Sequence, residues 1–217
     1  MEPPKSFQPY LDELIAFAGA ESRKAELLAA KAEYFRLTGE VFEDDQLFEQ
    51  RMASFLDYYL FDRRNAQGMT PAEELLEQRR ASAAPEAVSA LQSFTATVHG
   101  LFEVRKLGKG SVRLRELHSG KDYDVTERRQ VTGLEKGDIL EARLIPFSGH
   151  LLFSGAFCYH PKVAAPAIRK ELKRRKKEEP EKSANDLAWD CARMALKVDR
   201  YRQIPVDKIY DFENKKL

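Results

Sequence analysis

The pattern of apolar residues changes near Thr95, and this change limits the possible folds more than any other feature of the chain. Before Thr95, apolar residues recur at intervals of three and four, as in Leu11, Leu14 and Ile15, which predicts amphipathic helices. After it, β-branched and aromatic residues alternate with polar ones between glycine-containing turns, which predicts short strands joined by hairpins. We therefore expect an α+β fold in which helices and strands occupy separate parts of the sequence.

Three domains are expected on this basis. Residues 1–95 are predicted to form a helical N-terminal domain, residues 96–162 a small antiparallel β-barrel, and residues 163–217 a C-terminal helical extension with a charged linker. The barrel is expected because five or six short strands with tight turns follow one another within about 65 residues. Such an arrangement is typical of small closed or half-closed barrels.

The helical part contains a clear helix-start signal. Thr70, Pro71 and Glu73 have the spacing of a capping box, with Thr70 as the N-cap and Pro71 as the first helical residue. Two earlier helices are expected over 21–37 and from Asp44 to about residue 64.

The charges are distributed unevenly, although the net charge of the chain is only +1. Residues 1–95 contain ten basic and seventeen acidic residues, a net of −7, and residues 96–217 contain 26 and 18, a net of +8. An acidic part joined to a basic part predicts that the two dock onto each other or that each binds its own partner.

The sequence predicts a cytoplasmic protein. No apolar run approaches the roughly 18 residues of a membrane span, and no apolar signal-peptide core follows the N-terminus. Two cysteines, Cys158 and Cys191, lie among apolar residues, so we expect buried, reduced thiols.

Catalytic and metal-binding signatures are absent from the sequence. No two of the four histidines have metal-ligand spacing, and no nucleophile elbow, zinc-protease motif or phosphate loop occurs. The segment 108–111 is interpreted as a hairpin turn, because glycine supplies the positive φ that tight turns need. We therefore expect a protein that is not an enzyme and has no catalytic residues, no metal and no cofactor.

Two groups of segments are similar to a known family. The first is 55–64, followed by Gly68 and Thr70-Pro71, and the second comprises 100–104, 123–127, 137–144 and 157–161. Together they resemble an uncharacterised bacterial family with a helical first half and a β-rich second half. The resemblance covers roughly residues 50–165 and implies an architecture without implying an activity.

The β-rich part also resembles a PilZ domain, the cyclic di-GMP-binding barrel that ends in a helix. The similarity lies in residues 134–140 and in the helix that follows the strands. PilZ domains bind their ligand with an RxxxR segment and a DxSxxG turn. The turn at 116–121 is one residue shorter, with Glu in place of Asp, and Arg105, Arg113 and Arg115 have a different spacing. The resemblance thus implies a degenerate domain that does not bind the nucleotide in the usual way.

A basic run provides an alternative function. Residues 169–177 contain seven basic residues and one acidic residue, and such a run can neutralise phosphates of a nucleic acid. A solvated helix end, offset by the glutamates that follow, explains the same charges. Candidate binding residues are therefore Arg105, Arg113 and Arg115 together with Arg169, Lys170, Lys173, Arg174, Arg175, Lys176 and Lys177.

Binding of a protein partner is the main hypothesis. The helix expected from Asp44 carries aromatic residues on more than one side, and such a helix is buried on several sides. Its additional side is expected to face the barrel, the C-terminal helices or another protein, where aromatic residues are favoured. We therefore interpret the chain as a non-enzymatic adaptor or regulator of protein partners, with a nucleic-acid-binding module as the alternative. The sequence defines no small-molecule ligand and no oligomeric state.

Overall fold

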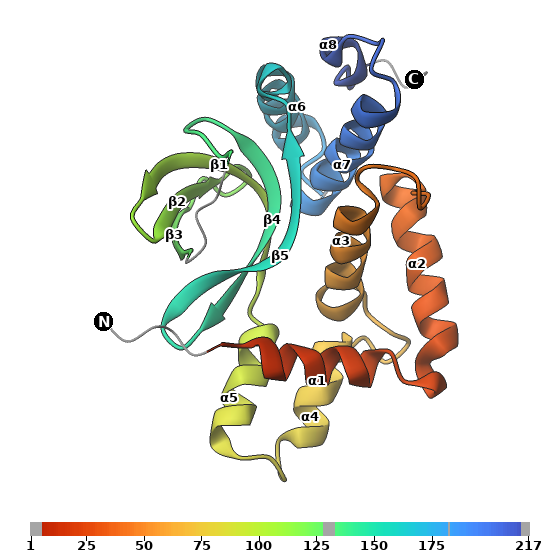
Figure 1. Ribbon diagram of the computed structural model, residues 1–217, viewed down its shortest axis with the longest axis vertical. Helices are drawn as coiled ribbons and strands as arrows, with labels where there is room; N and C mark the ends of the chain where they lie inside the picture. Colours follow the sequence, from red (N-terminus) through yellow and green to blue (C-terminus); the bar gives the residue numbers. More distant parts are fainter. Residues whose placement is uncertain (1–5, 128–132, 182, 214–217) are drawn as a thin grey trace.

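The computed structural model describes residues 6–127, 133–181 and 183–213. Helices precede and follow one antiparallel sheet, so the expected α+β class is confirmed (Figure 1). The helices are α1 (Gln8–Ala18), α2 (Lys24–Thr38), α3 (Phe48–Phe61), α4 (Pro71–Arg79), α5 (Pro85–Phe94), α6 (Ala165–Glu178), α7 (Ala184–Arg200) and α8 (Val206–Ile209), with short 3₁₀ turns at Glu21–Arg23 and Lys162–Ala164.

The sheet contains five strands in the order β3-β2-β1-β4-β5, and the paired neighbours run antiparallel. These are β1 (Val98–Gly108), β2 (Ser111–Glu116), β3 (Asp122–Thr126), β4 (Ile139–Phe147) and β5 (His150–His160). The sheet curls strongly (Figure 1), and Oγ1 of Thr126 on β3 lies 3.1 Å from Nδ1 of His150 on β5.

The predicted barrel is wrong, because the sheet does not close. In the part of the chain that the structure describes, the edge strands β3 and β5 share no backbone ladder. Closure of a barrel requires a matching tilt and stagger of all its strands, and a local alternation of apolar residues does not specify either.

Two element boundaries also differ from the expectation. The third helix begins at Phe48 and not at Asp44, because the carboxylate of Asp45 accepts the backbone N–H of Phe42 at 2.7 Å and holds the preceding residues in a turn. Helix α6 continues through the whole basic run 169–177 to Glu178, so the charged linker begins later than expected, after the run. The first predicted domain boundary falls between α5 and β1, and the second falls within the 3₁₀ turn Lys162–Ala164 that follows β5. Independent domains remain a prediction.

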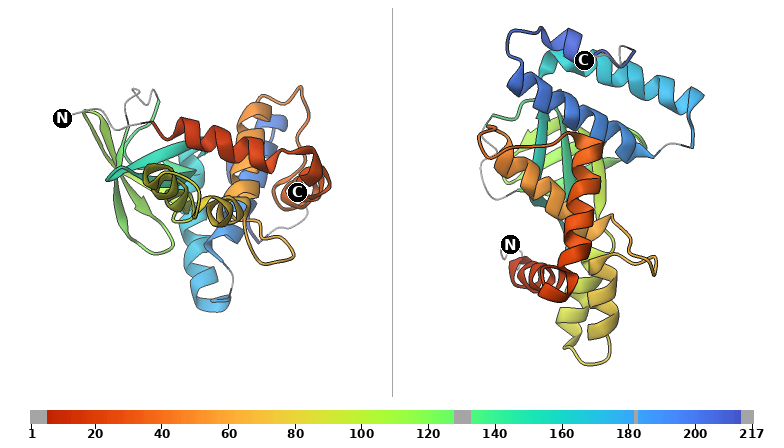
Figure 2. Two further views of the ribbon diagram at one scale, coloured as in Figure 1. Left: turned by 90° about the horizontal axis from the view of Figure 1, so that it is seen from below. Right: turned by 90° about the vertical axis from the view of Figure 1, so that its right-hand side faces the viewer.

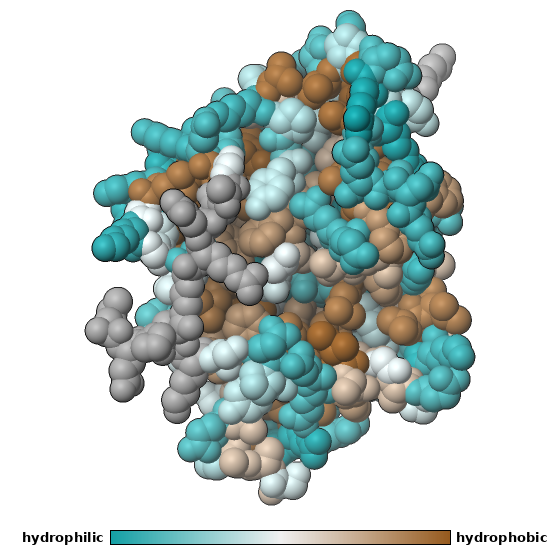
Figure 3. Space-filling view, viewed as in Figure 1, coloured by the Kyte–Doolittle hydropathy of each residue, from teal (hydrophilic) through white to brown (hydrophobic). Residues whose placement is uncertain are grey.

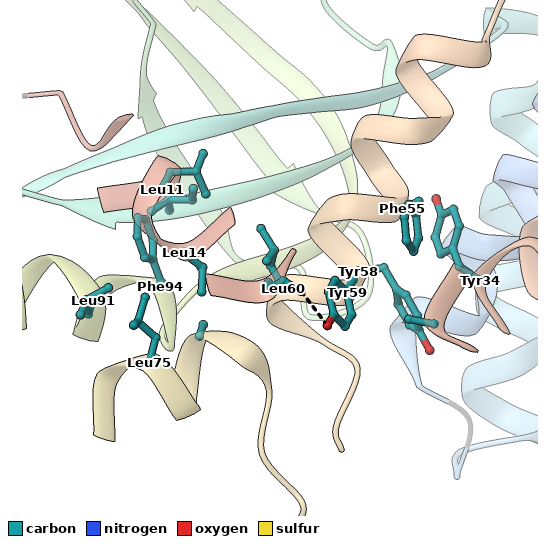
Figure 4. Packing of buried hydrophobic residues seen from close by; sticks show 14 of the residues in the cluster. Leu11, Leu14, Tyr34, Phe55, Tyr58, Tyr59, Leu60, Leu75, Leu91 and Phe94 are labelled. Atoms are coloured by element: carbon teal, nitrogen blue, oxygen red, sulfur yellow. Dashed lines mark hydrogen bonds between the residues drawn. The ribbon is translucent and has the colours of Figure 1, made fainter. Parts of the chain in front are cut away.

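Hydrophobic cores hold the described elements together. The helical core lies among the helices α1, α2, α3, α4 and α5 and contains Leu14, Tyr59 and Phe94 (Figure 4). Within it, the Tyr59 hydroxyl donates a hydrogen bond to the Ala18 carbonyl at 3.2 Å. A second core fills one face of the sheet, and a third lies between the other face and the C-terminal helices. The C-terminal segment docks there through Ile209 and Tyr210, as its apolar content suggested.

The C-terminal helices cover the sheet face that carries Leu101 and Ile139 (Figures 1 and 2). As a result β4 is buried on both faces along nearly its whole length. None of the helices in the described part of the chain combines the length and apolar character needed to span a bilayer.

Candidate functional site

A cluster of buried charged side chains lies where the helical part meets the sheet. Its centre is Arg143 of β4, whose side chain is only 2 % exposed. Its Nη2 donates to Oδ2 of Asp62, its Nε lies 3.4 Å from Oδ2 of Asp57, and its Nη1 donates to Oγ1 of Thr97 at 2.9 Å. We call Asp57, Asp62, His99, Glu141 and Arg143 the polar cluster.

An irregularity in the β4–β5 pairing shapes this cluster. Ala142 pairs with Phe157 and Leu144 with Phe153, so the register shifts at Arg143. Gly155, opposite the shift, has a φ of 104°, which favours glycine over any other residue. Bulges of this kind redirect side chains, and here the Ser154 hydroxyl donates to Oδ2 of Asp57 at 2.6 Å.

His99 joins the cluster to α7. Its Nε2 lies 2.9 Å from Oε1 of Glu141 and its Nδ1 lies 3.0 Å from Oδ1 of Asn185. Burial alone would lower the pKa of His99, but the hydrogen bond with Glu141 and the negative charges of Asp62 and Glu141 together outweigh burial, so the pKa is raised. Burial would likewise raise the pKa of Glu141, and His99 lowers it instead. The pair therefore favours an imidazolium that donates to both neighbours.

The cavity beside the polar cluster is small. It is lined by Asp57, His99, Glu141 and Arg143 among others and has a volume of about 10 Å³, the room of a single water molecule. A second small hollow, between α6 and α7, measures about 20 Å³. Neither hollow has room for an organic substrate. The ion pairs of Arg143 with Asp57 and Asp62 instead join the sheet to the helical part.

The two cysteines lie in the same interior region. Both are buried free thiols, as expected, and burial raises the pKa of Cys158 to about 12. A thiol of this kind is protonated at neutral pH and is a poor nucleophile. Within the described residues, no group of three or more His, Cys, Asp or Glu side chains is placed to hold a metal ion.

The basic run of α6 is largely engaged inside the molecule. Arg174 and Arg175 both donate to the buried carboxylate of Glu171, at 2.7 and 2.6 Å. The other contacts are Arg169 with Glu103, Lys170 with Glu213, Arg175 with Asp190 and Lys176 with the His118 carbonyl. Lys173 and Lys177 remain exposed.

The three arginines of β1 and β2 are also ion-paired. Arg113 and Arg115 make two hydrogen bonds each to Asp124 and Asp122 across the β2–β3 ladder, at 2.7 to 3.0 Å. Arg105 pairs with Glu103 at 2.9 Å.

The turn at 116–121 is stabilised from within. The carboxylate of Glu116 is buried and accepts the backbone N–H groups of His118 and Ser119, at 2.7 and 2.5 Å. The Glu116 carboxylate is therefore occupied by its own turn.

One family model matches the chain. It is DUF7986, described as a family of unknown function, and it covers residues 25–191, well over half of the sequence. The chain belongs to the DUF7986 family. No curated protein and no solved structure matches it. The predicted membership of a family without a known activity is thus confirmed. None of the comparisons links this DUF7986 member to PilZ domains.

Two larger hollows of this DUF7986 chain are grooves on its surface. The α1–α5 groove, with a volume of about 620 Å³, lies between α1, α5 and the β4–β5 hairpin, at the lower left of Figure 1. Its floor is Tyr10, Ala90 and Phe147, and serine hydroxyls including Ser89 and Ser148 form its rim. Ser148 has a φ of 49°, uncommon for a residue other than glycine, in the hairpin turn that closes the groove.

The α2 groove, of about 460 Å³, lies on the outer side of α2. Its lining residues are Leu28, Lys31, Ala32, Phe35, Arg36 and Glu40.

On the face turned to the viewer, hydrophobic side chains form a band across the middle of the molecule between hydrophilic regions (Figure 3).

Sequence reasoning missed both the polar cluster and the grooves. Arg143 and Asp62 are separated by 81 residues, and no local motif connects them. One signal was available: Glu141 and Arg143 interrupt an otherwise apolar strand at alternate positions, which places two charges on one buried face.

Proposed function

We propose that the protein is a non-enzymatic adaptor or regulator that binds a protein partner, and that the α1–α5 groove is its binding surface. The observation that carries this proposal is the contrast between hollows. The hollow beside the polar cluster has room for about one water molecule, whereas the α1–α5 groove has a volume of about 620 Å³. Open grooves of this size suit a segment of another chain.

The chemistry of the groove limits its occupant. An apolar floor of Tyr10, Ala90 and Phe147 favours an apolar side chain of the partner. The hydroxyls on the rim can exchange hydrogen bonds with the backbone of an extended segment, and Glu86 is the one charged residue among the groove-lining residues in the described part of the chain. We therefore expect an extended, weakly charged segment.

The nucleic-acid alternative has less support. Four of the seven basic residues in 169–177 are paired with carboxylates, so few of these charges are available to release counterions from a phosphate backbone. A PilZ-like sensor has less support for the same reason, since Arg105, Arg113 and Arg115 are each ion-paired. A cytoplasmic location agrees with the adaptor proposal.

The proposal is tested by blocking the groove without disturbing the fold. Ser89 is exposed on α5 and lines the groove, so Ser89→Arg places a long side chain into it. Gln92→Arg changes an exposed residue of the same helix that does not line the groove and serves as the matched control. Affinity capture with quantitative mass spectrometry should recover one protein with the wild type and the control, and several-fold less with Ser89→Arg.

Equal recovery with all three proteins would contradict the proposed surface. Steeply salt-dependent binding of labelled RNA or DNA, abolished by changing Lys173 and Lys177 to glutamine, would favour the nucleic-acid alternative instead.

A further inference from the structure

Two exposed cations line the α2 groove without acidic partners. Lys31 and Arg36 are both exposed, and neither makes an ion pair or a side-chain hydrogen bond in the part of the chain that the structure describes. Most arginines of this molecule are paired with carboxylates, for example Arg63 with Glu26 and Glu33. The two cations flank an apolar strip in which Leu28 is 57 % exposed.

The loop that follows α2 has the complementary character. Phe42 is 53 % exposed, and Glu43 and Asp44 beside it are exposed carboxylates that make no ion pair with any described residue. The loop is held in a fixed shape, because Asp45 accepts the Phe42 N–H at 2.7 Å and two hydrogen bonds from Arg200, at 2.8 and 2.5 Å.

The groove and the loop belong to the same side of the molecule. Glu40 lines the end of the α2 groove, and the loop begins at the next residues. Seen from the right-hand side, α2 runs along the front, with the loop and α7 near its upper end (Figure 2). An apolar, basic groove therefore lies beside an apolar, acidic projection.

We propose that this side of the molecule binds a second copy of the same chain, so that the loop 41–44 of each copy enters the α2 groove of the other. A two-fold axis brings one patch against its identical counterpart, which requires a patch that is complementary to itself. Phe42 then covers Leu28 of the partner copy, while Glu43 and Asp44 approach the partner's Lys31 and Arg36. This surface is distinct from the α1–α5 groove, and the inference does not depend on the proposed function.

Sedimentation velocity over a range of protein and salt concentrations tests the inference. We expect a dimer that dissociates on dilution and is weakened by salt, because its charge pairs lie at the surface. Reversing the groove charges (Lys31→Glu with Arg36→Glu) or the loop charges (Glu43→Lys with Asp44→Lys) should raise the dissociation constant about tenfold or more. All four residues are exposed, so these variants should keep their fold, which circular dichroism can check.

A mixture of the groove-reversed protein and the loop-reversed protein provides the decisive test. In the mixed dimer each groove again faces a loop of opposite charge, so dimerisation should return to the wild-type level. The control Lys109→Glu with Lys136→Glu makes the same change in net charge at exposed positions in the sheet region and should dimerise normally. A wild type that stays monomeric, reversals without effect, or a mixture that stays monomeric would each overturn the inference.

Discussion

Two buried histidines have pKa values that are shifted in opposite directions by their surroundings. His160 is buried, and its Nδ1 lies 2.9 Å from the hydroxyl of Tyr210. Burial lowers the pKa of His160 to about 4, so the folded protein carries a neutral ring that is hydrogen-bonded to the tyrosine hydroxyl. His99, in the polar cluster, shows the opposite direction because Glu141 stabilises its charged form.

His160 should make the protein acid-sensitive. The unfolded chain takes up a proton on this residue near its ordinary value of about 6.5, while the folded chain does so near 4, so stability is lost as pH falls between the two. The loss is roughly 3 kcal/mol in full, and His160→Asn should remove it. Urea unfolding at about pH 7 and about pH 4 measures this. An equal loss of stability in both proteins would show that other groups cause the acid sensitivity.

Helix ends were the elements that the sequence predicted best, because they depend on local chemistry. The Thr70 hydroxyl accepts the Glu73 N–H at 3.3 Å and the Glu73 carboxylate accepts the Thr70 N–H at 2.8 Å, as the spacing predicted. The start of α3 was predicted four residues early, since Asp45 caps a turn and pairs with Arg200, a residue far along the chain. Distant partners leave no local signal.

The cap of α4 gives a prediction at this scale. Thr70→Ala removes the acceptor of the Glu73 N–H at a buried position and should lower the free energy of unfolding by about 1–2 kcal/mol. Ser82→Ala, at an exposed turn after the same helix, should change it by less than about 0.5 kcal/mol. Denaturant titration of both variants distinguishes them, and equal stabilities would show that the capping box contributes little.

Across the whole molecule, the acidic and basic parts dock onto each other. Arg143 contacts Asp57 and Asp62, and Arg200 contacts Asp45, so basic residues after Thr95 bind acidic residues before it. The uneven charge distribution predicted either this docking or a separate partner for each part, and the sequence did not decide between the two. The absence of sheet closure and the composition of both grooves were beyond sequence reasoning, because each depends on how several elements pack together.

Site-specific photo-crosslinking in cells tests most directly whether the α1–α5 groove binds a protein partner, as we propose. A photoreactive amino acid at Ser89 lies at the groove, and the same group at Gln92 lies outside it on the same helix. We expect a discrete crosslinked protein at Ser89 and none at Gln92. No crosslinked protein at either position, or the same products at both, would contradict it.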